Sequence, residues 1–304
     1  MHPELLLVSE PTALDPKQFI GIPIALVGAV FLSLGAQFQH RGVAKVEAKH
    51  GDAVKGLSSR QMFALLARPS WVLGTLMLGL AVVFQLTSLG FSPIIVVQPL
   101  GAVALVITAV LNSRISKVKL NRSSVISIVL CVGGVGLFVL VAAFTAVDKP
   151  VTAGNLVTIL IVLAVVLVLF AVAFIVLGKS FKAIAYIVGA GVLYGFVATL
   201  AKVLISRLFQ GQFDALTILA LIGLIAAFAL GGYFVQNAYS SGPPDLVIAG
   251  LTVIDPLVAV GIGILVLGEA SQAPVWALFA YLAFGAVAIL GVFGLARYHP
   301  QAQR

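Results

Sequence analysis

Residues 155–178 read NLVTILIVLAVVLVLFAVAFIVLG, a run of 24 residues without a charged side chain. A helix of this length is long enough to cross the hydrocarbon core of a bilayer, which is about 30 Å thick. The whole chain has a similar character, because 61% of its 304 residues are hydrophobic and only 9% are charged. Soluble domains contain about 25% charged residues. The composition therefore excludes a soluble enzyme, a disulfide scaffold and a disordered chain, and it predicts a multi-pass membrane protein.

Hydropathy extends this pattern to nine predicted spans. Because backbone polar groups must be satisfied inside the bilayer, we expect every span to be a helix and the fold to be all-α. The predicted spans are residues 19–39, 71–90, 93–113, 123–144, 154–177, 183–206, 214–237, 245–267 and 274–296.

Lysine and arginine are distributed unevenly between the predicted spans. If segment 1–18 is extracytoplasmic, fourteen of the eighteen basic residues lie in cytoplasmic segments, three lie outside, and Lys202 lies within a span. The positive-inside rule then places the N-terminus outside, a loop at 40–70 in the cytoplasm, and the tail 297–304 in the cytoplasm. We expect a multi-pass protein of the plasma (cytoplasmic) membrane whose basic face contacts anionic lipid. Nucleic acid is not an expected partner.

Residues 19–144 and 179–296 share an order of features, and 145–178 form a connector helix between them. In each unit a second helix carries a glutamine eight residues before a proline, namely Gln85 and Gln236. A third helix has a polar residue directly before a proline, at Gln98-Pro99 and Asp255-Pro256. The two units begin at spans one and six, an odd number apart, so the second is inverted in the membrane. Inverted four-helix repeats are typical of secondary transporters.

Two stretches of the sequence carry a resemblance to a known family. GLAVVFQLTSLGFSPIIVVQPLGAVALVITAVLN begins at Gly79, and YFVQNAYSSGPPDLVIAGLTVIDPLVAVGIGILVLGE begins at Tyr233. They resemble the two halves of the drug/metabolite transporter superfamily in its EamA-like form. The nine-span format and the PLGA turn are closest to the NIPA-like branch, which is described as magnesium transporters. The resemblance implies a transporter over nearly all of 19–296.

The chain also departs from that branch. The resemblance implies an acidic residue in the second span, where this sequence has Val82, and an Asn-Glu-Arg turn where it has Ser116 to Leu120. Only Gly268-Glu269 is kept. Divalent cations bind through several oxygen ligands, usually with carboxylates among them. The single mid-span acid therefore argues against magnesium and favours another small solute.

Asp255 is the most informative residue of the sequence. It lies about ten residues into the eighth span, roughly 15 Å deep and close to the midplane. An acid at that depth is costly and is by default a functional hypothesis. Pro256 removes a helix hydrogen bond beside it. We predict a proton or substrate site at Asp255; the alternative is a protonated aspartate bonded to a neighbouring helix.

The other predicted binding residues are uncharged, and interhelical hydrogen bonding is the alternative explanation for each of them. They are Gln98, Gln85, Gln236, Asn237, Tyr194 and Gln37, with helix breaks predicted at Pro99 and Pro256. We expect Lys202 to extend to the outer surface, or alternatively to lie at the mouth of a cavity. Glu269 is expected to be solvated or paired with a helix end.

The leading hypothesis is a secondary transporter that moves a small solute by alternating access, with proton coupling through Asp255 left open. The alternative is a magnesium or other divalent-cation transporter. An enzyme that modifies lipid is less favoured, because Asp255 has no His, Cys or Lys companion at its depth. We therefore predict no catalytic residue, no metal site, no cofactor and no enzymatic activity. The expected partners are an ion or small-molecule substrate and lipid, and a homodimer is left open.

Overall fold

The computed structural model describes residues 19–50, 67–115, 121–177, 183–241 and 244–298. Every regular element within those ranges is helical, and nine helical segments there are long and apolar enough to span a membrane. The prediction of an all-α protein with nine spans is confirmed for this part of the chain. The helices are α1 (Gly21–His50), α3 (Pro69–Phe91), α4 (Ile94–Val97), η2 (Gln98–Leu100), α5 (Gly101–Ile115), α6 (Arg122–Thr145), α7 (Ala153–Leu177), α8 (Ala183–Phe209), α9 (Ala215–Ser241), α10 (Pro244–Leu265) and α11 (Val275–Tyr298).

Helix ends follow local sequence signals. Pro69 opens α3, where its missing N–H needs no partner. Asn121 caps α6 by accepting a hydrogen bond from the backbone N–H of Ser124 at 2.7 Å. After α10 the chain turns at Gly268, whose φ of 70° lies in the left-handed region that glycine tolerates best. The backbone conformation at Gly268 therefore sets where the next residue, Glu269, lies after the end of α10.

The loop predicted at 40–70 is shorter than expected. Residues 40–50, assigned to the loop 40–70, continue α1 as far as His50. Their sequence, HRGVAKVEAKH, lacks proline and is rich in Ala, Lys and Glu, which favour helix, so α1 continues beyond its apolar segment. Residues 51–66 of that loop lie outside the described part of the chain.

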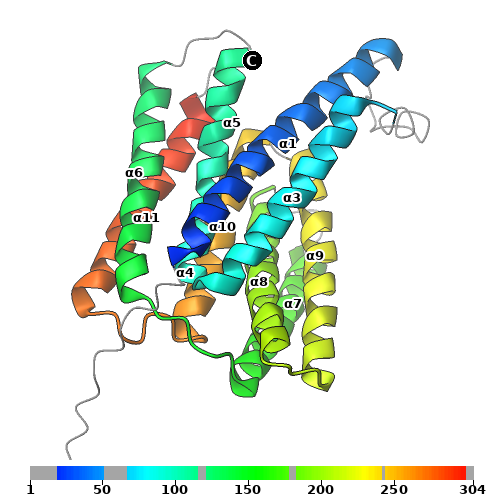
Figure 1. Ribbon diagram of the computed structural model, residues 1–304. Coiled ribbons are helices and arrows are strands. Elements are labelled where there is room, and N and C mark those ends of the chain that lie inside the picture. Colours follow the sequence, from blue (N-terminus) through cyan, green and yellow to red (C-terminus); the bar gives the residue numbers. More distant parts are fainter. Residues whose placement is uncertain (1–18, 51–66, 116–120, 178–182, 242–243, 299–304) are drawn as a thin grey trace, which may run out of the picture.

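The helices pack in pairs that correspond between the predicted repeats (Figure 1). Helix α1 packs mainly on α3, and α8 packs mainly on α9; α6 packs on α11. The connector α7 contacts α8 and α9 at the edge of the second unit. These pairings are those that two equivalent four-helix units would form, and the two-fold relation between the units remains a prediction.

Glycine allows two pairs of these helices to approach closely. A Cβ atom at Gly191 or Gly195 of α8 would lie 2.6 Å from the Cβ of Ile254 or Val258 on α10. At Gly134 of α6 a Cβ would lie 2.5 Å from a backbone nitrogen of α11. Gly133 and Gly136 of the same helix have no atom within 4 Å of an added Cβ. They point away from α11, because neighbouring residues of one helix face different directions.

The bundle has two chemically different ends. The basic end carries the first or last turns of α3, α5, α6 and α11 and contains Arg68, Arg114, Arg122 and Arg297. The opposite end contains Asp148, Arg207 and the turn between α10 and α11. Helix α1 begins at this opposite end and α11 finishes at the basic end (Figure 1). The chain therefore crosses the bundle an odd number of times, and which end faces the cytoplasm remains the prediction made from charge.

Candidate functional site

A central cavity of about 770 Å³ lies between the two halves of the bundle. Its wall is formed by α1, α3 and the η2–α5 segment from the first half, and by α8, α9 and α10 from the second. Most of the lining is apolar. The polar side chains on it are Gln85, Gln98, Tyr194, Tyr239, Thr252 and Asp255. Solute sites of secondary transporters lie in this kind of place, at the interface of two repeats.

Asp255 is the only carboxylate among the residues that line this cavity. Its Oδ1 atom is buried and has no hydrogen-bond partner among the described residues. The side chain is held there because Gly191 and Gly195 let α10 lie directly against α8; a Cβ at Gly195 would be 3.0 Å from the carbonyl oxygen of Asp255. A buried carboxylate oxygen without a partner is costly. Because Asp255 lines the cavity, its carboxylate can accept a hydrogen bond or a cation from a solute that reaches it.

The structure brings some of the predicted residues together and leaves others apart. Gln85, Gln98 and Tyr194 line the cavity with Asp255. Gln37 is buried beside α5, where its amide donates a hydrogen bond to the side chain of Asn112, and it is not among the lining residues.

Gln236 and Asn237 of α9 also lie away from the cavity lining. Gln236 is exposed, and Asn237 donates a hydrogen bond to the carbonyl of Tyr233 one turn earlier at 2.8 Å. Helix α9 is apolar on all sides, so its sequence gives no periodic signal for the face that turns inward.

The two predicted helix breaks differ in outcome. At Pro99 the third span is interrupted, because α4 ends at Val97 and a short 3₁₀ turn precedes α5. At Pro256 the helix α10 continues without interruption from Pro244 to Leu265, which corrects the prediction of a break there. A proline inside a helix removes one hydrogen bond, and close packing of α10 on α8 keeps the remaining turns helical.

Sequence reasoning missed three polar or aromatic residues of the cavity wall, namely Tyr239, Thr252 and Phe228. Thr252 could have been found, since it precedes Asp255 by three residues and therefore shares its helix face. Tyr239 and Phe228 lie on α9, where no apolar periodicity distinguishes the faces. Val82, the position at which the resemblance implies an acid, also lies on the wall.

The described residues contain no group of three or more His, Cys, Asp or Glu side chains that could hold a metal ion. The cavity offers one carboxylate, two glutamine amides and two tyrosine hydroxyls. This set can hold a solute by hydrogen bonds and one charge, or hold a partly hydrated cation. It does not form a cage of several carboxylates.

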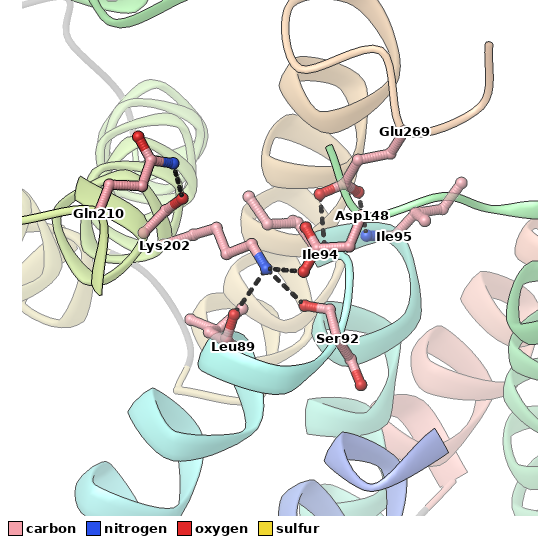
Figure 2. Close-up of polar contacts among 9 residues, drawn as sticks. Leu89, Ser92, Ile94, Ile95, Asp148, Lys202, Gln210 and Glu269 are labelled. Atoms are coloured by element: carbon pink, nitrogen blue, oxygen red, sulfur yellow. Dashed lines mark hydrogen bonds and ion pairs between the residues drawn. The ribbon is translucent and has the colours of Figure 1, made fainter. Parts of the chain in front are cut away.

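Lys202 belongs to a buried polar cluster at the end of the bundle opposite the basic end (Figure 2). Its ammonium donates hydrogen bonds to the carbonyl oxygens of Leu89 at 2.7 Å and Ser92 at 3.0 Å, and it pairs with Asp148 at 2.9 Å. Only 3% of Lys202 is exposed, so the prediction that it extends to the surface is wrong. The carbonyl groups at the end of α3 and one carboxylate satisfy its three donors inside the protein, which removes the need to reach water.

Glu269 lies on the other side of the turn between α3 and α4, where α4 begins (Figure 2). Its two carboxylate oxygens accept hydrogen bonds from the backbone N–H groups of Ile94 at 2.8 Å and Ile95 at 2.9 Å. The predicted pairing with a helix end is confirmed, and solvation is wrong because only 1% of Glu269 is exposed. Burial raises the pKa of Glu269 to about 7, against the two backbone hydrogen bonds and the charge of Lys202, which lower it.

Comparison with known proteins identifies relatives of this chain. The family described as "Magnesium transporter NIPA" matches residues 16–179. An uncharacterized protein of Corynebacterium glutamicum is 28% identical over 261 residues, which are 86% of this chain and 89% of that protein. No solved structure matches the chain.

Two plant proteins match a shorter part of the chain. The probable magnesium transporter NIPA1 of Arabidopsis thaliana is 27% identical over 121 residues, 40% of this chain and 35% of that protein. The probable magnesium transporter NIPA4 of the same plant is 29% identical over 139 residues, 45% of this chain and 39% of that protein. The match thus covers little more than a third of each plant transporter.

Proposed function

Because the chain belongs to the NIPA magnesium transporter family, whose match covers more than half of it, we propose that it is a secondary transporter that binds its solute at Asp255. The central cavity carries this proposal. It lies between two halves of the bundle, is walled by six helical segments, and contains one carboxylate with an oxygen that has no partner. Alternating access would expose this cavity first to one side of the membrane and then to the other.

The chemistry of the wall favours a small solute with a polar or cationic group. The lining is mostly apolar, so the solute contributes its own apolar surface to the site. Asp255 supplies the single charge, and Gln85 and Gln98 supply amide groups on the facing half. The lining contains no His, Cys or Lys that could act with Asp255 as nucleophile or base, so an enzyme that modifies lipid is not favoured.

Proton coupling fits the same residue. A carboxylate that faces a cavity and lacks a partner can bind either a proton or a cationic solute, and the two compete for its oxygens. Binding of one then releases the other, which would couple solute movement to a pH gradient. No other acidic side chain lines the cavity, so this role would fall on Asp255.

A magnesium ion is the second proposed substrate, favoured by the family match and by the names of the plant relatives. Mg²⁺ usually keeps several waters and binds through one or two carboxylates. Asp255, with the amide oxygens of Gln85 and Gln98, could hold a hydrated ion in a cavity of this volume. The absence of an acid at Val82 leaves that ion with one protein charge, which argues for weak binding.

Uptake by the purified protein in liposomes tests both proposed substrates, a small polar or cationic solute and Mg²⁺. Mg²⁺ entry is followed with an enclosed fluorescent indicator, and a panel of amines, amino acids and other small solutes is tested with and without a pH gradient. Asp255→Asn keeps the shape of the side chain and should abolish gradient-driven uptake. The matched control, Asp214→Asn, removes a carboxylate from the exposed turn before α9 and should leave uptake unchanged.

The outcomes separate the proposals. Mg²⁺ entry that is lost in Asp255→Asn supports the cation version, whereas uptake of another solute without Mg²⁺ entry supports the leading version. Gradient-driven uptake at the wild-type rate in Asp255→Asn would refute a binding role for this residue. No uptake of any member of the panel, by protein that remains folded, would count against transport itself.

A further inference from the structure

A second, smaller cavity lies beyond the central one, at the end of the bundle opposite the basic end. It has a volume of about 260 Å³ and is lined by polar groups that include Asp148, Ser206 and Gln210. Leu89 lines both cavities. On the facing helix α8, Ala201 lines the central cavity and its neighbour Lys202 lines the second. A single layer of side chains therefore separates the two spaces.

Opposite charges from the second half of the chain hold this layer in place. Lys202 binds the carbonyl oxygens of Leu89 and Ser92 at the C-terminal end of α3. Glu269 binds the N–H groups of Ile94 and Ile95 at the start of α4. Each charge has the sign that the exposed backbone groups of its helix end prefer. We call Lys202, its partner Asp148 and Glu269 the charge clamp.

The clamp also holds an apolar contact between α3 and α8. A Cβ atom at Gly90 would lie 3.4 Å from a methyl group of Ile205 and 3.3 Å from the ring of Phe209. Any larger side chain at Gly90 would need these neighbours to move. The two halves thus meet across Gly90 and Leu89, at the wall of the second cavity, and the ammonium of Lys202 holds α3 against α8 there.

We propose that the charge clamp is the outer gate of the transport pathway. Release of Lys202 from the end of α3 would join the two cavities and open the central cavity to the outside. This inference rests on the transport function proposed above, and it takes the outer side from the distribution of basic residues. It assigns Leu89 and Lys202 as the narrowest point of the pathway and the second cavity as its outer vestibule.

Arg207 provides a matched control on the same helix. It is also a buried cation of α8, but it bonds Asp214 at 2.7 Å and Thr217 at 2.9 Å. These partners belong to α9 and to the turn before it, within the same half of the chain. Opening between the two halves does not require these bonds to break.

Access to one engineered cysteine tests the gate. The native Cys131 is replaced by serine, and Ala198→Cys is introduced in the wall of the central cavity, about one turn inward from Lys202. Oriented vesicles are exposed to a charged, membrane-impermeant thiol reagent on the outer or the inner side. Lys202→Gln and, as a milder second variant, Asp148→Asn should speed labelling from outside at least about tenfold, since each removes a charge-assisted hydrogen bond of the closed state.

Lys202→Arg, which keeps the charge, and Arg207→Gln should both leave outside labelling near the wild-type rate. Labelling of the introduced cysteine from the inner side serves as a control that the central cavity is intact in every variant. Unchanged outside labelling in both Lys202→Gln and Asp148→Asn would overturn the gate, and so would an equal increase in Arg207→Gln. The assay follows access and not uptake, so a failed gate and a failed transport function give different results.

Discussion

Substitution of Glu269 should change stability in a way that depends on both the new side chain and the pH. The carboxylate accepts two backbone hydrogen bonds from Ile94 and Ile95 in a buried place. Glu269→Ala removes both acceptors and leaves two buried N–H groups without a partner. Each such group costs about 1–3 kcal/mol, so the variant should lose roughly 2–6 kcal/mol at acidic pH. In a chain of this size that is a fall in Tm on the order of 10 °C.

The pH dependence follows from the raised pKa of Glu269. Its pKa is about 7 in the folded protein and 4.5 ordinarily, because burial outweighs the hydrogen bonds and Lys202, and the charge of Asp148 acts with burial. The contribution of the Glu269 carboxyl group to the free energy of unfolding is fully present below pH 4.5 and is lost as the pH rises through about 7. Above that pH the free energy of unfolding no longer changes through this group. A shift of this size corresponds to about 3 kcal/mol.

Glu269→Gln separates the hydrogen bonds from the charge. The amide oxygen can accept one of the two backbone hydrogen bonds, but the amide NH2 group cannot accept the other, so near pH 5 the variant should be less stable than the wild type by about 1–3 kcal/mol. Between pH 5 and pH 8 the wild type should lose up to about 3 kcal/mol, because its carboxyl group becomes a buried charge, whereas glutamine does not titrate and the variant should not show this loss. The assay is thermal unfolding of detergent-purified protein at both pH values, with the three proteins in the same buffer.

Two results would contradict this account of Glu269. If the wild type loses no stability relative to the glutamine variant between pH 5 and pH 8, the pKa of Glu269 is not raised. If the alanine and glutamine variants have the same Tm at pH 5, the backbone hydrogen bond that the amide oxygen should keep contributes nothing measurable. Either result can be read without knowing the solute.

Two further predictions concern packing and topology. Gly134→Ala places a Cβ 2.5 Å from the backbone nitrogen of Ala288 and should destabilise by about 1–3 kcal/mol, whereas Gly133→Ala, which faces open space, should be neutral or stabilising by up to about 1 kcal/mol. Thermal unfolding in detergent measures both, and equal effects would refute the packing argument. A reporter active only outside the cytoplasm should be active when fused near Asp148 and silent when fused after Arg304; the reverse pattern would invert the orientation.

The existence of the spans could be predicted from the sequence because it depends on local properties. Length and apolarity define a membrane helix, and Pro99 lies in a 3₁₀ turn between α4 and α5. The depth of Asp255 followed from counting residues along one helix. None of these inferences needs knowledge of which helices are neighbours.

The partners of polar residues could not be predicted, because they lie on other helices and are often backbone atoms. Lys202 was expected to extend to the outer surface, but its partners include two carbonyl groups more than a hundred residues away. Backbone carbonyls at a helix end have no signature in the sequence. The same reason explains Gln37, whose partner is on another helix, and Gln236, whose helix is apolar on every side.

Four charged side chains in the described part of the bundle are largely buried, and their surroundings separate structural from functional roles. Lys202, Glu269 and Arg207 each form at least two hydrogen bonds to groups that stay in place in this state. Asp255 instead faces the central cavity with one oxygen that has no partner. Arg207 also has one buried nitrogen without a partner, Nη1, but its charge is paired with Asp214, whereas no Lys or Arg lines the cavity beside Asp255. The missing partner of Asp255 is therefore best supplied by what enters the cavity, and the clamp determines from which side it enters.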